Sequence, residues 1–136
     1  MIFMNTSQTS SQVPNSARFQ DALLALRPIA DGQMKMLREH FRAPGHRLTA
    51  TQLADAAGYP NYRTANLHYG KLGRALGEYL SFPPPQQDKG EPLYTSVIAF
   101  GEDGTGIGDK AHYVWTMRPE LVEALSDLPW GFRQKI

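Results

Sequence analysis

The sequence predicts an α+β fold, in which a helical helix-turn-helix core is followed by a β-hairpin and a C-terminal helix. Two observations predict it. In residues 48–80, a short capped helix, a turn containing Gly58 and a longer amphipathic helix follow one another. Further on, residues 93–100 and 110–117 are rich in β-forming residues and enclose the glycine-rich loop 101–109. Helices followed by such a hairpin are typical of a winged helix.

The helix boundaries within residues 48–80 follow from capping patterns. Thr49 and Gln52 have the spacing of a capping box and predict a short helix that ends at Ala57. Gly58 stands where a left-handed C-cap residue belongs. Asn61 is a good N-cap for the long helix, which we predict over residues 62–80. One face of that helix carries an apolar stripe, formed by Ala65, Tyr69, Leu72, Leu76 and Leu80.

Three other helices are expected. The first has Asn15 or Ser16 as its N-cap, and the second covers residues 32–42 with Asp31 as its N-cap. A closing helix of residues 120–125 follows Pro119, after which Trp130 and Phe132 are expected to pack back onto the body. Residues 1–15 are uncharged and rich in Ser, Thr, Gln and Asn, which indicates a flexible tail ahead of a single winged-helix-like domain, 16–136.

Composition excludes several classes of site. The absence of cysteine excludes disulfides, zinc–thiolate sites and a cysteine nucleophile. The four histidines lack metal-ligand spacing, so we expect them at the surface or the edge of the core. No nucleophile elbow or catalytic carboxylate pair is visible, and GTGIGD (104–109) lies between two strands rather than between a strand and a helix. We therefore expect neither an enzyme nor a metal or cofactor site.

The expected cellular location and the distribution of charge limit the kinds of partner that the protein could bind. No apolar run has membrane-spanning length and the N-terminus is not a signal peptide, so we expect a cytoplasmic protein without membrane contact. Residues 33–80 hold seven Lys/Arg against three acidic residues, whereas residues 81–136 hold five against eight. Residues 33–80 could therefore bind a polyanion, although an ordinary uneven distribution of surface charge would give the same numbers of charged residues.

The long helix carries the candidate binding face. Opposite its apolar stripe lie Arg63, Leu67, Lys71 and Arg74, which could meet the DNA major groove, or could form an ordinary solvated face. Candidate DNA-contacting residues are three cations (Arg63, Lys71, Arg74), three possible base readers (Thr64, Asn66, Leu67) and three cations that could hold flanking phosphates (Arg38, Arg42, Arg47).

Three glycines within the long helix need an explanation. Gly70, Gly73 and Gly77 each cost roughly 1 kcal/mol of helix stability relative to Ala. A row of glycines allows close approach of another backbone, so either tight intramolecular packing or a docking groove for DNA or protein would account for them. Trp115 could stack on a base, but an aromatic residue on a strand is more often in the core.

Three segments resemble a small domain found beside HNH-type nuclease domains in bacterial restriction-type proteins. They are LTATQLADAAGY (48–59), YRTANLHYGKLGR (62–74) and VWTMRPELVEAL (114–125). The resemblance implies a DNA-recognition module linked to restriction or anti-phage defence. The chain contains no HNH motif. The alternative is a protein-binding adaptor or inhibitor of phage or mobile-element type, which acts on a nucleic-acid-processing defence complex through the acidic C-terminal half.

Overall fold

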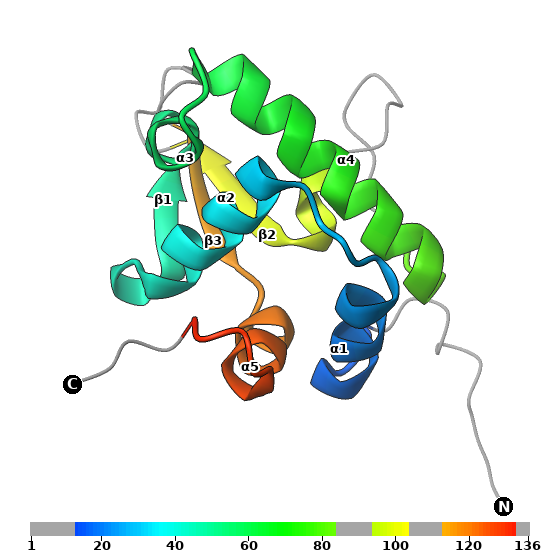
Figure 1. The fold of residues 1–136 in the computed structure, drawn as a ribbon. Coiled ribbons are helices and arrows are strands. Elements are labelled where there is room, and N and C mark those ends of the chain that lie inside the picture. The colour runs from blue at the N-terminus through cyan, green and yellow to red at the C-terminus, as the bar shows by residue number, and fades with distance from the viewer. Residues whose placement is uncertain (1–12, 84–93, 104–112, 133–136) are drawn as a thin grey trace, which may run out of the picture.

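Helices surround one face of a small sheet in the computed structural model, which describes residues 13–83, 94–103 and 113–132 (Figure 1). The long helix α4 runs across one side of the molecule, and α1 and α5 lie next to each other at the opposite end from α3. The α-helices are α1 (Ser16–Ala25), α2 (Asp31–Arg42), α3 (Ala50–Ala57), α4 (Tyr62–Leu80) and α5 (Pro119–Asp127).

The sheet has three antiparallel strands in the order β1-β3-β2. The strands β2 (Ala99–Asp103) and β3 (Tyr113–Met117) form a hairpin as predicted, with connecting residues 104–112 outside the described residues. The predicted position of the first strand is wrong, because β2 shares only residues 99–100 with the predicted strand 93–100 and includes residues 101–103 of the predicted loop. The strand β1 (Arg47–Thr49), which the sequence did not predict, pairs with the other edge of β3. The order α2, β1, α3, α4, β2, β3 is that of a winged helix, so the predicted fold class is confirmed.

The caps of α3 and α4 form as the sequence predicts. The Thr49 hydroxyl accepts from the Gln52 amide at 3.1 Å, while the Thr49 amide donates to the Gln52 side chain at 2.8 Å. Gly58 closes α3 with φ of 78°. The Asn61 side chain accepts from the Thr64 amide at 3.0 Å. The capped C-terminus of α3, the capped N-terminus of α4 and the short turn between them therefore fix where α4 starts relative to α3.

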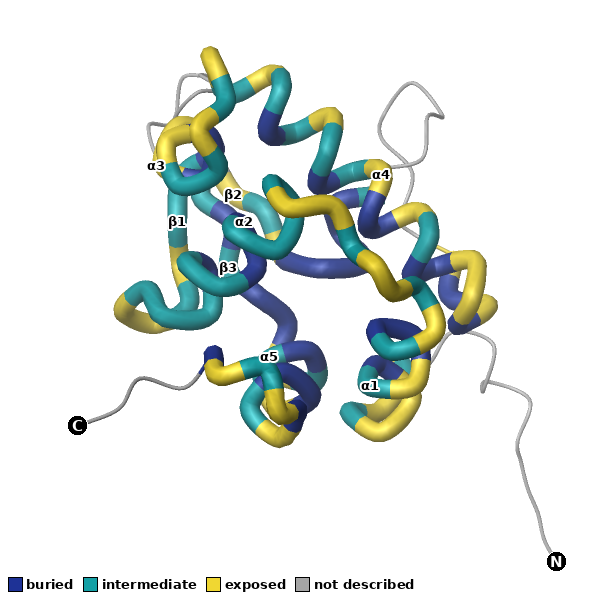
Figure 2. The backbone as a smooth tube through the Cα atoms, in the orientation of Figure 1, coloured by how far each residue is buried: buried dark blue, intermediate teal, exposed yellow. Residues whose placement is uncertain are grey.

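The core lies between the helices and the inner face of the sheet (Figure 2). The predicted stripe of α4 is entirely buried, and Phe132 returns to the core as expected. Asp31 is the first residue of α2 rather than its N-cap, and its carboxylate pairs with the Lys35 ammonium at 3.1 Å. Asn15 caps α1, while residues 1–12 of the predicted tail lie outside the described residues.

His40 corrects the expectation that every histidine lies at the surface or the core edge. Its side chain is fully buried between α2, α4 and β3. Because a carbonyl oxygen only accepts, Nε2–H donates to the Trp115 carbonyl at 2.8 Å. The Tyr69 hydroxyl then donates to Nδ1, also at 2.8 Å. Burial lowers the pKa of His40 to about 4 and raises that of Tyr69.

Tyr94–Val97 form a one-turn 3-10 helix, η3, instead of the beginning of the predicted 93–100 strand. Its Thr95, Ser96 and Val97 are buried against the glycine side of α4. A Cβ on Gly73 would lie 2.9 Å from the Tyr94 carbonyl carbon and closer still to its oxygen. The close approach allowed by the glycines is therefore used inside the protein, at least where η3 covers them.

Candidate nucleic-acid interface

The outer face of α4 is open to solvent along its length. On this face exposed residues recur every three or four positions, in the series Arg63, Leu67, Lys71, Arg74 and Glu78, and the exposed Tyr79 lies off this face. Leu67 is 56% exposed, whereas the five apolar residues of the predicted stripe, large and small, are buried on the opposite face of the helix. The predicted phase of the helix is therefore correct, and three cations and one leucine share its outer face.

Charge on this face is greatest toward the N-terminus of α4. Arg74 pairs with Glu78, Nε to Oε2 at 3.1 Å, and this hydrogen bond raises the pKa of Arg74. The Arg63 guanidinium lies over the Tyr62 ring, 5.1 Å from its centre. Within residues 13–83, 94–103 and 113–132, neither Arg63 nor Lys71 forms an ion pair, so both charges remain available to an anionic partner.

The turn that precedes α4 is braced from two sides. The Tyr59 ring stacks on the His68 ring at 4.9 Å between centres. A Cβ on Gly32 would collide with the Tyr59 side chain, so α2 packs tightly against the same turn. The Gln33 side chain donates to the His68 carbonyl at 3.0 Å. These contacts hold α4 in one orientation relative to α2 and α3.

The three residues predicted as base readers are not equivalent. Leu67 points outward, whereas Thr64 and Asn66 are only partly exposed. The Thr64 hydroxyl donates to the Asn61 side-chain oxygen at 3.2 Å, which uses its proton within the cap. Asn66 precedes Gly70 by four residues, about one helical turn, so it lies toward the glycine side of α4. Leu67 is thus the one predicted reader at the centre of the exposed face.

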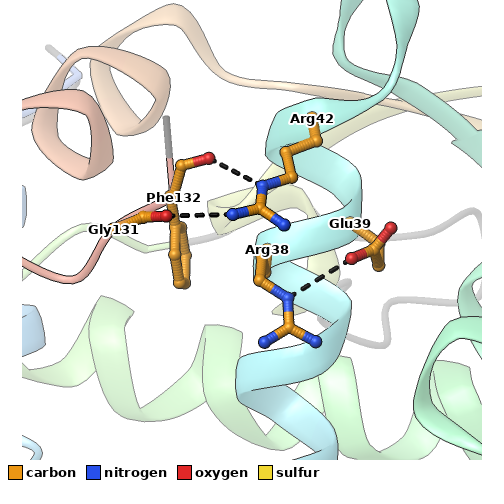
Figure 3. A network of polar contacts seen from close by, with 5 residues as sticks. All are labelled: Arg38, Glu39, Arg42, Gly131 and Phe132. Atoms are coloured by element: carbon orange, nitrogen blue, oxygen red, sulfur yellow. Dashed lines mark hydrogen bonds and ion pairs between the residues drawn. The ribbon is translucent and has the colours of Figure 1, made fainter. Parts of the chain in front are cut away.

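The predicted phosphate-holding cations Arg38 and Arg42 are engaged elsewhere (Figure 3). Arg42 donates from Nε to the Phe132 carbonyl at 2.8 Å and from Nη2 to the Gly131 carbonyl at 2.9 Å. It ties the segment after α5 to α2. Arg38 pairs with the neighbouring Glu39 carboxylate at 3.3 Å. Both arginines line an open hollow of about 580 Å³ between α2 and α3, to which α4 contributes no residue.

Arg47, the third of these cations, lies on the sheet. Its guanidinium reaches across β3 to the Glu102 carboxylate at 3.7 Å, and both side chains are more than half exposed. The structure therefore does not join Arg38, Arg42 and Arg47 to the face of α4 through any contact among the described residues. Arg38 pairs with its sequence neighbour, but the partners of Arg42 and Arg47 are far away in sequence, 90 residues for the Phe132 carbonyl that Arg42 contacts, so no local pattern could have indicated these two.

Trp115 and the remaining histidines offer no further binding site among the described residues. Trp115 is buried in the core, so it is not placed to stack on a base. His46 Nδ1 is bonded to the Phe41 carbonyl at 2.6 Å, and His112 lies outside the described residues. In the part of the chain that the structure describes, no three His, Asp or Glu side chains come together as metal ligands. That same part has no helix long and apolar enough to cross a membrane.

Comparison with known proteins adds no relative. No protein-family model, no curated protein and no solved structure matches this chain. The resemblance to domains beside HNH-type nucleases stays a prediction from the three sequence segments that carry it. Conclusions about function depend on the geometry of the α4 face.

Proposed function

We propose that this protein binds double-stranded DNA through the N-terminal half of the exposed α4 face, formed by Arg63, Leu67 and Lys71. A single observation carries the proposal: the second helix of a helix-turn-helix has, on both sides of an exposed leucine, cations that form no ion pair with any residue the structure describes. The described residues of this half, 62–71, include no acidic side chain.

The spacing of the two cations suits a DNA groove. Lys71 follows Arg63 by eight positions, which corresponds to about 12 Å along a helix. The major groove of B-DNA is about 12 Å wide. A helix that crosses the groove would therefore bring one cation to the phosphates on each side, with Leu67 above the base edges. Arg74 lies one turn further on, where Glu78 offsets its charge.

The more distant cations have a secondary place in this proposal. Arg38 and Arg47 remain about half exposed and could add phosphate contacts where DNA extends beyond α4. Arg42 uses two of its nitrogens to hold the segment after α5. We therefore assign Arg42 a structural role, and its replacement should change stability before it changes DNA affinity.

The salt dependence of DNA binding tests the proposal. Each phosphate contact contributes roughly one unit to the slope of log affinity against log salt concentration. The double variant Arg63→Ala/Lys71→Ala should bind a generic duplex more weakly and flatten the slope by about two units. Its thermal midpoint should stay close to that of the wild type, because exposed helix charges contribute only tenths of a kcal/mol.

A matched control removes the same charge elsewhere. Arg18 and Arg27 are exposed residues at α1, distant in sequence from α4. The variant Arg18→Ala/Arg27→Ala has the same net charge as the α4 variant and should keep the wild-type slope. Equal slopes for all three proteins, or no binding by the wild type at micromolar concentration in low salt, would refute DNA binding by α4. The α4 face would then be examined as a protein-binding surface.

A further inference from the structure

We infer that Leu67 recognises the C5-methyl group of thymine in the major groove, and thereby gives the protein a preference for thymine at the base pair under the centre of α4. This inference rests on the proposed function. Single exposed apolar residues are common on protein surfaces and need no special role. Leu67 differs because of what surrounds it.

The position of Leu67 is the first argument. It lies one helical turn after Arg63 and one turn before Lys71, at the midpoint of the two unpaired cations. If these cations contact phosphates on both sides of the groove, the residue between them faces the base edges. The residue there is a leucine that is 56% exposed, and it has no polar atom with which to read a hydrogen-bonding pattern.

The groups that each base presents in the major groove then determine which base Leu67 can recognise. Thymine is the unmodified base that presents a methyl group in the major groove, and apolar side chains recognise it by contact. The neighbouring Thr64 spends its hydroxyl proton on Asn61, and Asn66 is partly buried on the flank of α4. Apolar contact is consequently the mode of base recognition that the centre of this face offers.

Replacement of thymidine by deoxyuridine provides a direct test, because it removes the methyl group and keeps base pairing. A target duplex would first be enriched from a random-sequence library with the wild-type protein. The same duplex would then be prepared with thymidine or with deoxyuridine at every position. The wild type should bind the deoxyuridine duplex about four-fold more weakly for each methyl group that Leu67 contacts.

Variants separate a Leu67 contact from an effect of the methyl group on DNA shape. Leu67→Ala should bind the thymidine duplex more weakly and should bind both duplexes equally, whereas Leu67→Met should keep the preference. Tyr79→Ala removes the other exposed large apolar side chain of α4, which lies off the face of Leu67, and should behave as the wild type. Thermal midpoints of all variants should stay near that of the wild type.

Two results would overturn the inference, and they differ from failure of the proposed function. Equal wild-type binding to the two duplexes would show that no methyl group is recognised. A preference that persists in Leu67→Ala would show that another feature recognises it. Absence of binding to either duplex would overturn both the proposed function and the inference.

Discussion

Gly73 and Gly70 lie on the same side of α4 and give opposite predictions for replacement by alanine. Intrinsic helix propensity alone favours alanine at both sites by roughly 1 kcal/mol. At Gly70, among the residues that the structure describes, the new Cβ would meet the Thr95 hydroxyl alone, at 3.6 Å, which is an ordinary contact. We therefore expect Gly70→Ala to raise the free energy of unfolding by about 0.5–1 kcal/mol.

At Gly73 the new Cβ would overlap the backbone of η3. The Tyr94 carbonyl carbon would be 2.9 Å away, its oxygen closer, and the Thr95 Cα 3.5 Å away. Backbone cannot swing aside as a flexible side chain can, so α4 and η3 must separate. Overpacking in a tight core costs typically 1–3 kcal/mol and occasionally more. Because the overlap is with backbone, we expect a cost of about 3 kcal/mol, at the upper end of that range. After the gain in helix propensity, Gly73→Ala should lower the free energy of unfolding by about 2 kcal/mol.

Urea-induced unfolding, followed by far-ultraviolet circular dichroism, would measure both variants against the wild type. The expected order of midpoints is Gly70→Ala above wild type above Gly73→Ala, with the two variants separated by about 3 kcal/mol. A Gly73→Ala protein as stable as Gly70→Ala would refute the reasoning, because it would mean that η3 does not press on α4 at this position.

Two further predictions concern the core. Leu76 is fully buried, so Leu76→Ala should cost about 2–5 kcal/mol in the same unfolding assay, and a change below 0.5 kcal/mol would contradict the packing described above. The pKa of His40 is about 4 in the folded protein and 6.5 is its ordinary value, so the unfolded chain takes up a proton first as pH falls. Stability should therefore be fully present above pH 6.5 and decline toward pH 4 by up to ~3 kcal/mol, at about 1.4 kcal/mol for each unit of pKa difference. His40→Gln, which lacks that titration, should remove this part of the pH dependence, and an unchanged profile would show that another group causes it.

The part of the fold that the sequence predicted is the part set by local chemistry. The bounds of α4 follow from the Asn61 cap and from an apolar stripe that repeats over 19 residues. The strand β1 has three residues, too few for a period to show, and it exists because β3 offers a free edge. Likewise, η3 takes its shape from the glycine side of α4 rather than from its own β-forming residues.

The candidate site also has one part that the sequence could predict and another part that it could not. The outer face of α4 could be predicted because a helical wheel places it opposite the core. The roles of the other cations could not, since Arg42 binds carbonyls of residues 131 and 132 and Arg47 binds a carboxylate two strands away. The sequence indicated which cationic residues could contact phosphate. Only the tertiary structure showed which of them already bind carbonyl or carboxylate groups within the protein.

The hydrogen bonds of His40 to Tyr69 and to the Trp115 carbonyl influence the register in which the strands of the sheet pair. The imidazole requires an acceptor at the Trp115 carbonyl and a donor at Tyr69, and it is sealed from water. If β3 slipped by one residue against its neighbours, this carbonyl would move away and leave a buried donor without a partner, at a cost of about 1–3 kcal/mol. A three-stranded sheet with one edge strand of three residues has few hydrogen bonds with which to define its own alignment. One histidine on α2 thus penalises misaligned forms of a sheet to which it does not belong.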